Sequence, residues 1–300
     1  MQANKMPRTG GTIGLFCPSH VAEMARYEPM LAALKRLGFR VKLGPNFLKD
    51  TYGYAASAEE RAEDLNTLVA DDEVHMILFS GGESAAEVLP FIDYENIRRH
   101  PKLFSSYSDG TSILNPIYAQ TGLVTYYGAG VGEFADLRHY DYMQFCAHFV
   151  EGHEAREFAS DSEWKTLRGG RGKGILIGGY TSLFGLLLGN PYFRYDQDEK
   201  YLLFLEDHQC FSAVGAVATY LAFIGQSAFM KNVTGLIFGH YCADAPDDLL
   251  RLLERFGERH GIPVAYTDDF GHGTRHAILP IGVKAALDAD ERTLRFLSES

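Results

Sequence analysis

The sequence has few cysteines, and they form no recognisable metal or disulfide motif. The four are Cys17, Cys146, Cys210 and Cys242, and no two of them have the C-x-x-C spacing of zinc and redox sites. We therefore expect neither a zinc knuckle nor a disulfide framework. Free and mostly buried thiols are the expectation instead, because unpaired cysteine is among the most buried residue types.

Positive charge is also scarce. Lys and Arg together number 28 against 39 Asp and Glu, which gives a net charge of −11 at pH 7. A nucleic-acid partner requires clustered Lys and Arg that neutralise phosphates. The charge balance therefore argues against nucleic acid and leaves a small or cationic substrate as the expected partner.

Long apolar segments are missing as well. No run approaches the roughly 18 apolar residues of a membrane-spanning helix, and the opening residues, MQANKMPRTGG, contain no apolar signal core. We therefore expect a cytoplasmic protein with no membrane partner.

What the sequence does contain is an ordinary globular composition, 46% hydrophobic and 22% charged over 300 residues. That length favours two domains, since single cores stop growing at roughly 250 to 300 residues. We place an N-terminal domain at 1–150, a polar, Gly-rich linker at 151–173 and a C-terminal domain at 174–300.

Strand and helix patterns alternate along both halves, as in α/β folds. Strands are predicted at 11–16, 40–43, 74–79, 123–127, 174–179, 201–205, 234–238 and 263–265. Helices are predicted at 24–37, 58–69, 85–89, 112–121, 140–150, 182–188, 213–224 and 247–259. We expect an open, mostly parallel N-terminal domain of the flavodoxin or Rossmann type, a C-terminal α/β domain, and an active site in the cleft between them.

A serine marks the turn between the apolar run at 102–104 and the predicted helix at 112–121. Ser108 lies in the segment YSDGT, and a serine at such a strand-to-helix turn has the geometry of a nucleophile. The alternative is an ordinary turn or helix cap, because Ser-Asp pairs are common there. Two glycines, Gly81 and Gly82, follow the strand at 74–79 and allow close approach of a ligand to the backbone.

Two more candidates lie in the second half. Glu206 ends the strand at 201–205, and His272 stands between two glycines. Either could have another role: Glu206 could be a surface acid, with Asp207 competing for its place. His272 could bind metal with the residues Asp268, Asp269 and His276, although the flanking glycines disfavour the helix that would align the two histidines.

These motifs, taken together and in this order, resemble the LD-carboxypeptidase family of serine peptidases (peptidase family S66), and most closely its branch of microcin C immunity (MccF-like) peptidases. The likeness rests on YSDGT at 107–111, the Gly81-Gly82 pair, FLED at 204–207, and Gly271-His272 followed by LPIG at 279–282.

The resemblance implies a serine carboxypeptidase-type hydrolase with a Ser108, Glu206 and His272 triad. The oxyanion hole would use the backbone N–H of Asp109 and one from Gly81 or Gly82. The substrate would be a small peptide-like molecule, such as a peptidyl nucleotide or a murein peptide. The resemblance implies no metal or other cofactor. It does imply a homodimer.

One aromatic residue, and several positions that differ from the family pattern, affect which substrate is expected. In the microcin-immunity branch an aromatic side chain can stack on a nucleotide base, and Trp164 is the candidate here; burial at the domain junction is the alternative. The sequence departs from the family pattern at four positions that would flank the cleft: Ser80, Ser106, Tyr180 and Cys210. A metal-dependent hydrolase and a non-catalytic binding protein remain the rival interpretations.

Overall fold

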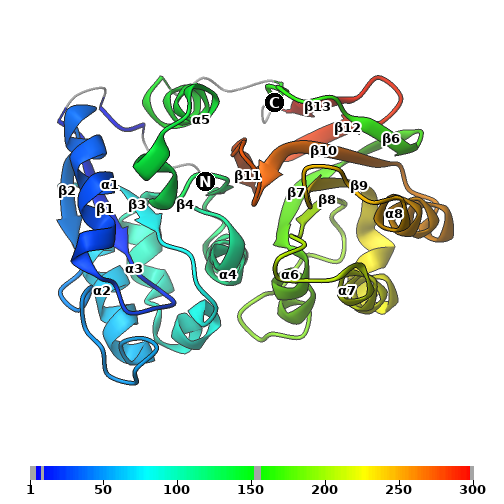
Figure 1. Ribbon diagram of the computed structural model, residues 1–300. Coiled ribbons are helices and arrows are strands. Elements are labelled where there is room, and N and C mark those ends of the chain that lie inside the picture. The colour runs from blue at the N-terminus through cyan, green and yellow to red at the C-terminus, as the bar shows by residue number, and fades with distance from the viewer. Residues whose placement is uncertain (1–4, 8–9, 152–156, 298–300) are drawn as a thin grey trace. The chain divides into compact units, whose positions relative to one another are not determined.

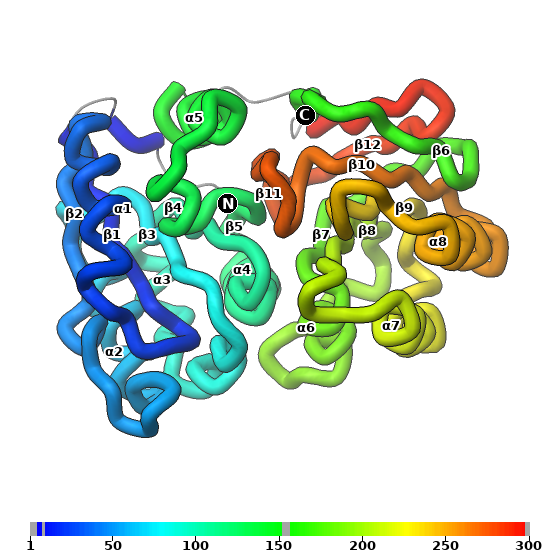
Figure 2. The backbone as a smooth tube through the Cα atoms, viewed as in Figure 1, coloured from blue at the N-terminus to red at the C-terminus, as the bar shows by residue number. Residues whose placement is uncertain are grey.

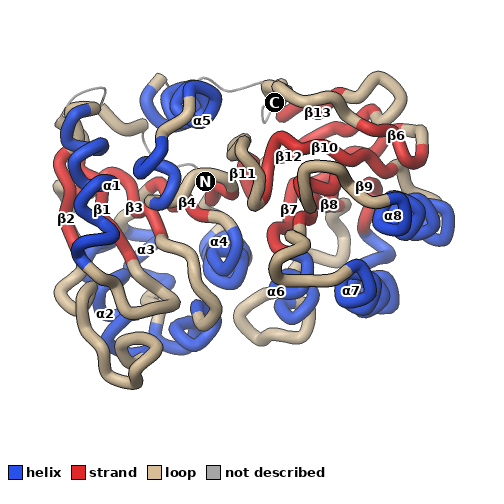
Figure 3. The backbone as a smooth tube through the Cα atoms, in the orientation of Figure 1, coloured by secondary structure: helices blue, strands red, loops and turns tan. Residues whose placement is uncertain are grey.

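The computed structural model describes residues 5–7, 10–151 and 157–297 (Figure 1). Contacts divide the chain into two compact units, Met1–Gly152 and His153–Ser300. Each unit is built on a sheet flanked by helices (Figure 3). The α/β class expected from the alternating pattern is confirmed. No helix among the described residues is both long enough and apolar enough to span a membrane.

The sheet of the N-terminal unit consists of parallel strands in the order β5-β4-β3-β1-β2. Their bounds are β1 (Thr12–Phe16), β2 (Arg40–Leu43), β3 (Val74–Phe79), β4 (Leu103–Ser106) and β5 (Thr125–Tyr127). This is the flavodoxin-like order, in which sheet growth reverses between β1 and β3. Ligands of such sheets bind outside the carboxyl ends of the strands at that reversal point.

Five helices accompany this sheet: α1 (Met24–Arg36), α2 (Ala58–Ala70), α3 (Tyr94–Arg99), α4 (Thr111–Thr121) and α5 (His139–Phe145). Helices α2, α3 and α4 pack side by side. Shorter helical turns are η1 (Ala85–Phe91), η2 (Ser108–Gly110) and η3 (Gly132–Asp136). The helix predicted at 140–150 is interrupted: after Phe145 the chain continues as a π-helical turn, η4 (Cys146–Val150).

The C-terminal unit has a mixed sheet in the order β13-β12-β7-β8-β9-β10-β6. The bounds are β6 (Lys165–Arg168), β7 (Arg171–Tyr180), β8 (Tyr201–Glu206), β9 (Val233–His240), β10 (Val264–Gly271), β12 (Lys284–Asp288) and β13 (Thr293–Phe296); β11 (Leu279–Ile281) lies between β10 and β12 in the chain. Strands β7 to β10 are parallel, and β6, β12 and β13 join the sheet antiparallel.

Three helices connect the parallel strands of this unit: α6 (Thr181–Leu187), α7 (Val214–Gln226) and α8 (Asp247–His260). They pack in a row, α6 against α7 and α7 against α8 (Figure 2). Strand β6 falls inside the segment 151–173 that we expected to be a linker. Its sequence, KTLR, is polar because it forms the edge of the sheet, with only β10 beside it.

Candidate active site

Ser108 lies in a strained turn at the carboxyl end of β4. It opens the helical turn η2, which leads directly into α4. Its φ of 56° lies in the left-handed region, which Arg292 alone shares among the described residues other than glycine. A nucleophile at a strand-to-helix elbow adopts such a strained conformation. The Ser108 N–H donates to the hydroxyl of the buried Tyr127, 2.9 Å away on β5.

The neighbouring Asp109 uses its side chain to hold three loops together. Its carboxylate is fully buried and accepts hydrogen bonds from the Ser19 hydroxyl at 2.6 Å and the Ala85 N–H at 2.8 Å. Burial raises the pKa of Asp109, although these hydrogen bonds act in the opposite direction. Because Ser19 follows β1 and Ala85 follows β3, this carboxylate fixes the Ser108 turn beside the reversal point of the sheet.

The Gly81-Gly82 turn follows β3 and is exposed. Gly82 has a φ of 153°, and a Cβ on it would lie 2.2 Å from the Cβ of Ser19. A side chain at this position would therefore push away the loop that bonds Asp109. The requirement for glycine here is steric as well as conformational.

A buried arginine, Arg61, also forms hydrogen bonds to the loops after β1 and β3. Arg61 on α2 is 2% exposed, and its guanidinium donates to the Pro18 carbonyl and to the Ser84 carbonyl and hydroxyl. It also forms an ion pair with Glu87. The loops after β1 and β3 are therefore joined through one side chain that is almost fully removed from water.

In the C-terminal unit, Glu206 and His272 meet at the carboxyl edge of the sheet. Glu206 is the last residue of β8 and is fully buried, and His272 directly follows β10. The Glu206 Oε2 lies 2.9 Å from the His272 Nδ1. Because a carboxylate can only accept, Nδ1 carries the proton, and Nε2 is the basic nitrogen of the neutral ring.

The electrostatics of His272 favour its charged form. Burial alone would lower the pKa of His272, but the charge and hydrogen bond of Glu206, with a smaller contribution from Asp207, raise it above its ordinary value. The Glu206 carboxylate thus fixes the ring tautomer and stabilises the imidazolium. Both properties belong to the base of a hydrolytic triad.

Asp207, the competing acid, points to a different partner. Its Oδ1 accepts from the Tyr180 hydroxyl at 2.7 Å and from the His208 N–H at 2.9 Å. Burial raises the pKa of Asp207 to about 6. The Tyr180 ring in turn packs edge-on against His272, with centroids 5.4 Å apart. Asp207 and Tyr180 therefore support His272 from the side, while Glu206 makes the direct bond.

Three residues of the alternative metal site, Asp268, Asp269 and His272, each bond different side chains. Asp268 accepts from Tyr266 at 2.8 Å and lies 2.7 Å from His240, whereas Asp269 accepts from Ser160 and Thr267. His272 bonds Glu206. Over residues 5–7, 10–151 and 157–297 no group of three or more His, Cys, Asp or Glu side chains has the arrangement of a metal site.

Trp164 is 4% exposed and donates its indole N–H to Asp269 at 3.1 Å. Its ring packs against Phe158, with centroids 5.6 Å apart. Little of the ring surface is open for stacking on a base. The burial favours the packing interpretation of Trp164 over the ligand-binding one.

Several residues that build these sites were not singled out from the sequence. They are Ser19 and Tyr127, each of which bonds a candidate residue far away in the chain, and Arg61, which bonds Ser84 close to the Gly81-Gly82 turn. Ser19 had a detectable signal, because it is a polar residue in the loop that follows a buried strand. For Arg61, on the predicted helix at 58–69, nothing in the pattern distinguished it from the surface charges around it.

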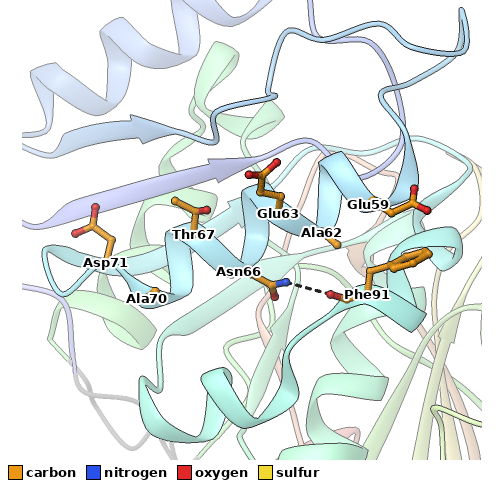
Figure 4. Close-up of a pocket in the computed structure, with 8 residues that line it drawn as sticks. All are labelled: Glu59, Ala62, Glu63, Asn66, Thr67, Ala70, Asp71 and Phe91. Carbon is orange, nitrogen blue, oxygen red and sulfur yellow. Dashed lines mark hydrogen bonds between the residues drawn. The ribbon is translucent and has the colours of Figure 1, made fainter.

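A hollow lies along α2 (Figure 4), and Ser108 is not among the residues that line it. Its lining includes the acids Glu59, Glu63 and Asp71, together with Phe91 and small residues such as Ala62 and Ala70. It contains neither a serine nor a histidine. It therefore lacks the groups required for nucleophilic hydrolysis.

Comparison with known proteins gives matches over both units of the chain. The family models for the LD-carboxypeptidase N-terminal and C-terminal domains match residues 13–128 and 173–287. A probable murein peptide carboxypeptidase of Bacillus subtilis is 31% identical, over 95% of this chain and 91% of its own. The microcin C7 self-immunity protein MccF of Escherichia coli is 26% identical, over 95% and 92%.

Solved structures give the same result for the fold. The crystal structure of an MccF-like protein from Bacillus anthracis superimposes with a TM-score of 0.90 at 26% identity, covering 100% of both chains. Both family domains are thus present in order, each on one of the two units. The chain belongs to the LD-carboxypeptidase family and is an enzyme of the serine carboxypeptidase type.

Proposed function

We propose that this enzyme hydrolyses an amide bond near the carboxyl end of a small peptide-like substrate, using Ser108, His272 and Glu206 as a catalytic triad. The observation that carries the proposal is the 2.9 Å bond between His272 and the buried Glu206 at the carboxyl edge of the second sheet. A buried carboxylate that holds an imidazole in this tautomer is the orienting half of a triad.

The reaction proceeds in two stages. The Ser108 Oγ attacks the carbonyl carbon while His272 Nε2 accepts the hydroxyl proton. The carbon–nitrogen bond then breaks, and His272 returns the proton to the leaving amine, which leaves an ester on Ser108. Water, deprotonated by His272, hydrolyses that ester and regenerates the serine. The reaction needs no metal or cofactor.

The negative oxygen that forms in each stage requires two N–H donors. We assign one to the backbone of Asp109, next to the nucleophile, and the other to the Gly81-Gly82 turn. The Asp109 side chain bonds Ser19 and Ala85, so it holds in place the loops that carry the two donors. Loss of one such donor typically costs about 10²–10³-fold in rate.

Two substrate classes fit this chemistry. One relative carries the name of a murein peptide carboxypeptidase, and MccF has been solved in complex with aspartyl sulfamoyl adenosine. The first class is a murein tetrapeptide with an L,D linkage, and the second is an aminoacyl sulfamoyl adenylate. Each presents an amide next to a compact polar group. We propose that the natural substrate belongs to one of these two classes.

The direct test is turnover of both substrate classes by the wild type and by Ser108→Ala. Wild-type turnover of at least one class, abolished in Ser108→Ala, is the expected result. Ser227→Ala is the matched control, since its hydroxyl bonds the Ile224 carbonyl in the other unit. Equal and negligible turnover by wild type and Ser108→Ala would favour the rival interpretation, a binding protein without catalysis.

A metal-dependent mechanism is tested with the same assay. Turnover that survives a chelator, in a sample whose metal content has been measured, supports the triad. Loss of turnover on chelation and recovery on addition of a divalent metal would favour the rival metal-dependent hydrolase.

A further inference from the structure

A second histidine, outside the triad, bonds the backbone of the turn that is proposed to complete the oxyanion hole. His20 lies in the loop after β1, two residues beyond Pro18. Its Nδ1 is 2.8 Å from the Gly81 carbonyl oxygen. A carbonyl oxygen only accepts hydrogen bonds, so His20 must be the donor, and Nδ1 carries the proton in either charge state of the ring.

The other side of the ring is fixed as well. The His20 Nε2 lies 2.9 Å from the hydroxyl of Tyr27, a residue of α1 that is 2% exposed. With the proton on Nδ1, the neutral ring accepts the Tyr27 proton at Nε2. Tyr27 is itself held by Phe47, with ring centroids 4.9 Å apart. A chain of hydrogen bonds therefore runs from the core through Tyr27 and His20 to the Gly81 carbonyl.

That chain determines how the next peptide N–H points. The carbonyl of Gly81 and the N–H of Gly82 belong to one planar peptide group and point in opposite directions. Holding the carbonyl toward His20 therefore turns the Gly82 N–H away from His20. Among the described residues this N–H has no hydrogen-bond partner, and Gly82 is exposed.

Because glycine is flexible, the peptide group between Gly81 and Gly82 needs a contact from another residue to keep this orientation. A Cβ on Gly81 would meet no atom within 4 Å, and Gly82 has a φ of 153°. A turn of two glycines can rotate the peptide group between them at little steric cost. His20 supplies the contact that selects one orientation.

We propose that His20 is a positioning residue of this enzyme, which aims the Gly82 N–H as the second oxyanion donor by holding the Gly81 carbonyl. The inference rests on the proposed function, since it assumes that Ser108 is the nucleophile. It assigns the donor to Gly82 and explains why a histidine follows Pro18-Ser19 in this chain. His20 contacts neither the substrate nor the reacting atoms in this role.

The test compares His20→Ala, His20→Asn and His75→Ala. Asparagine can place an amide N–H near the position of Nδ1, so it should restore the hold. His75 is the matched control: its Nδ1 also bonds the backbone, accepting from the Thr12 N–H at 3.3 Å, but at the amino end of the sheet. Each variant is assayed as the full chain, with its thermal unfolding measured beside its kinetics.

Two reactions serve as readouts. One is turnover of the murein tetrapeptide or the aminoacyl sulfamoyl adenylate, whichever the wild type hydrolyses. The other is labelling of Ser108 by a fluorophosphonate, in which the serine oxygen–phosphorus bond forms, fluoride leaves and His272 takes the proton. The phosphoryl oxygen occupies the oxyanion position, so the labelling rate reports the hole without requiring the natural substrate.

We expect His20→Ala to lower kcat and the labelling rate by about 10-fold or more, within the roughly 10²–10³-fold limit set by complete loss of a donor. KM and the pH midpoint of the acid limb should stay as in the wild type, because neither binding nor His272 is altered. His20→Asn should recover most of the rate, and His75→Ala should match the wild type.

Wild-type rates in His20→Ala would overturn the inference. So would equal losses in His20→Ala and His20→Asn accompanied by equal drops in unfolding temperature, since these indicate a merely structural role. Failure of the proposed function has a different signature, namely turnover and fluorophosphonate labelling that persist in Ser108→Ala.

Discussion

At the scale of single residues, Glu206 raises the pKa of His272, which is the proposed base. Burial works against the charged imidazole, yet the Glu206 charge and hydrogen bond prevail, so the pKa of His272 lies above its ordinary value of 6.5. In the proposed mechanism, His272 must be neutral to accept the Ser108 proton. A raised pKa therefore moves the onset of activity to higher pH.

We expect kcat/KM to fall as the pH drops through the raised pKa of His272, with a midpoint above 6.5. The free enzyme sets this limb of the profile. The measurement is a pH–rate profile under conditions where substrate is far below KM. A midpoint below 6.5 would contradict the assignment of His272 as the base.

Replacing the two adjacent acids separates their roles. Glu206→Gln should lower kcat by about 10⁴-fold, as loss of the orienting acid does in other triads. It should also move the acid limb of the pH–rate profile to lower pH, because the charge that raises the pKa of His272 is gone. Asp207→Asn should have a much smaller effect, because Asp207 bonds Tyr180 and His208 rather than His272. Steady-state kinetics of both variants over pH provide the check, and reversed magnitudes would transfer the role to Asp207.

Ser108, Glu206 and His272 could be picked out from the sequence because each lies next to a recognisable strand end or glycine pair. Their supports could not be predicted in the same way. The Tyr127 hydroxyl reaches Ser108 from 19 residues away, and Ser19 reaches Asp109 from 90. Such contacts depend on strand order, which local hydrophobic patterns do not specify.

At the scale of elements, the parallel strands were the easiest to predict. The expected strands at 40–43 and 74–79 coincide with β2 and β3, because continuous apolar or alternating runs bounded by turns are distinctive. The short antiparallel strands β12 and β13 were missed. Their sequences, KAALD and TLRF, mix charged and apolar residues as outer strands do, so local pattern does not separate them from loops.

One glycine in β7 shows how closely the central strands of the second sheet approach. A Cβ on Gly178, which has a φ of 149°, would lie 1.7 Å from the Phe204 carbonyl oxygen on β8. We expect Gly178→Ala to lower the free energy of unfolding by about 3 kcal/mol or more, since backbone strain and overpacking each cost about 1–3 kcal/mol. Urea unfolding measures this change.

The matched control is Gly215→Ala in α7, where a Cβ would meet nothing within 4 Å. That change should leave stability unaltered or raise it by less than about 1 kcal/mol, because alanine is the better helix former. Similar stabilities for the two variants would mean that β7 and β8 are not so tightly apposed.

At the scale of the whole molecule, the proposed triad draws on both units of the chain. Ser108 belongs to Met1–Gly152, and Glu206 and His272 belong to His153–Ser300. The proposal therefore takes its nucleophile from one unit and its base and acid from the other. The family models divide the chain in the same way, one for each half.

This division predicts the outcome of a mixing experiment. Ser108→Ala and His272→Ala proteins should each be inactive, and a mixture incubated long enough for subunit exchange should remain so, because all three residues come from one chain. Turnover by the mixture, with neither protein active alone, would show instead that the site forms between the chains of an oligomer.

The buried bond between Glu206 and His272 has a practical consequence, since it lies wholly within one half of the protein. A variant silenced at the serine keeps the imidazole in its native surroundings, so nuclear magnetic resonance can follow the protonation of that ring with no turnover to disturb it. The inactive enzyme thereby becomes the cleanest reporter of the acidity on which the active one depends.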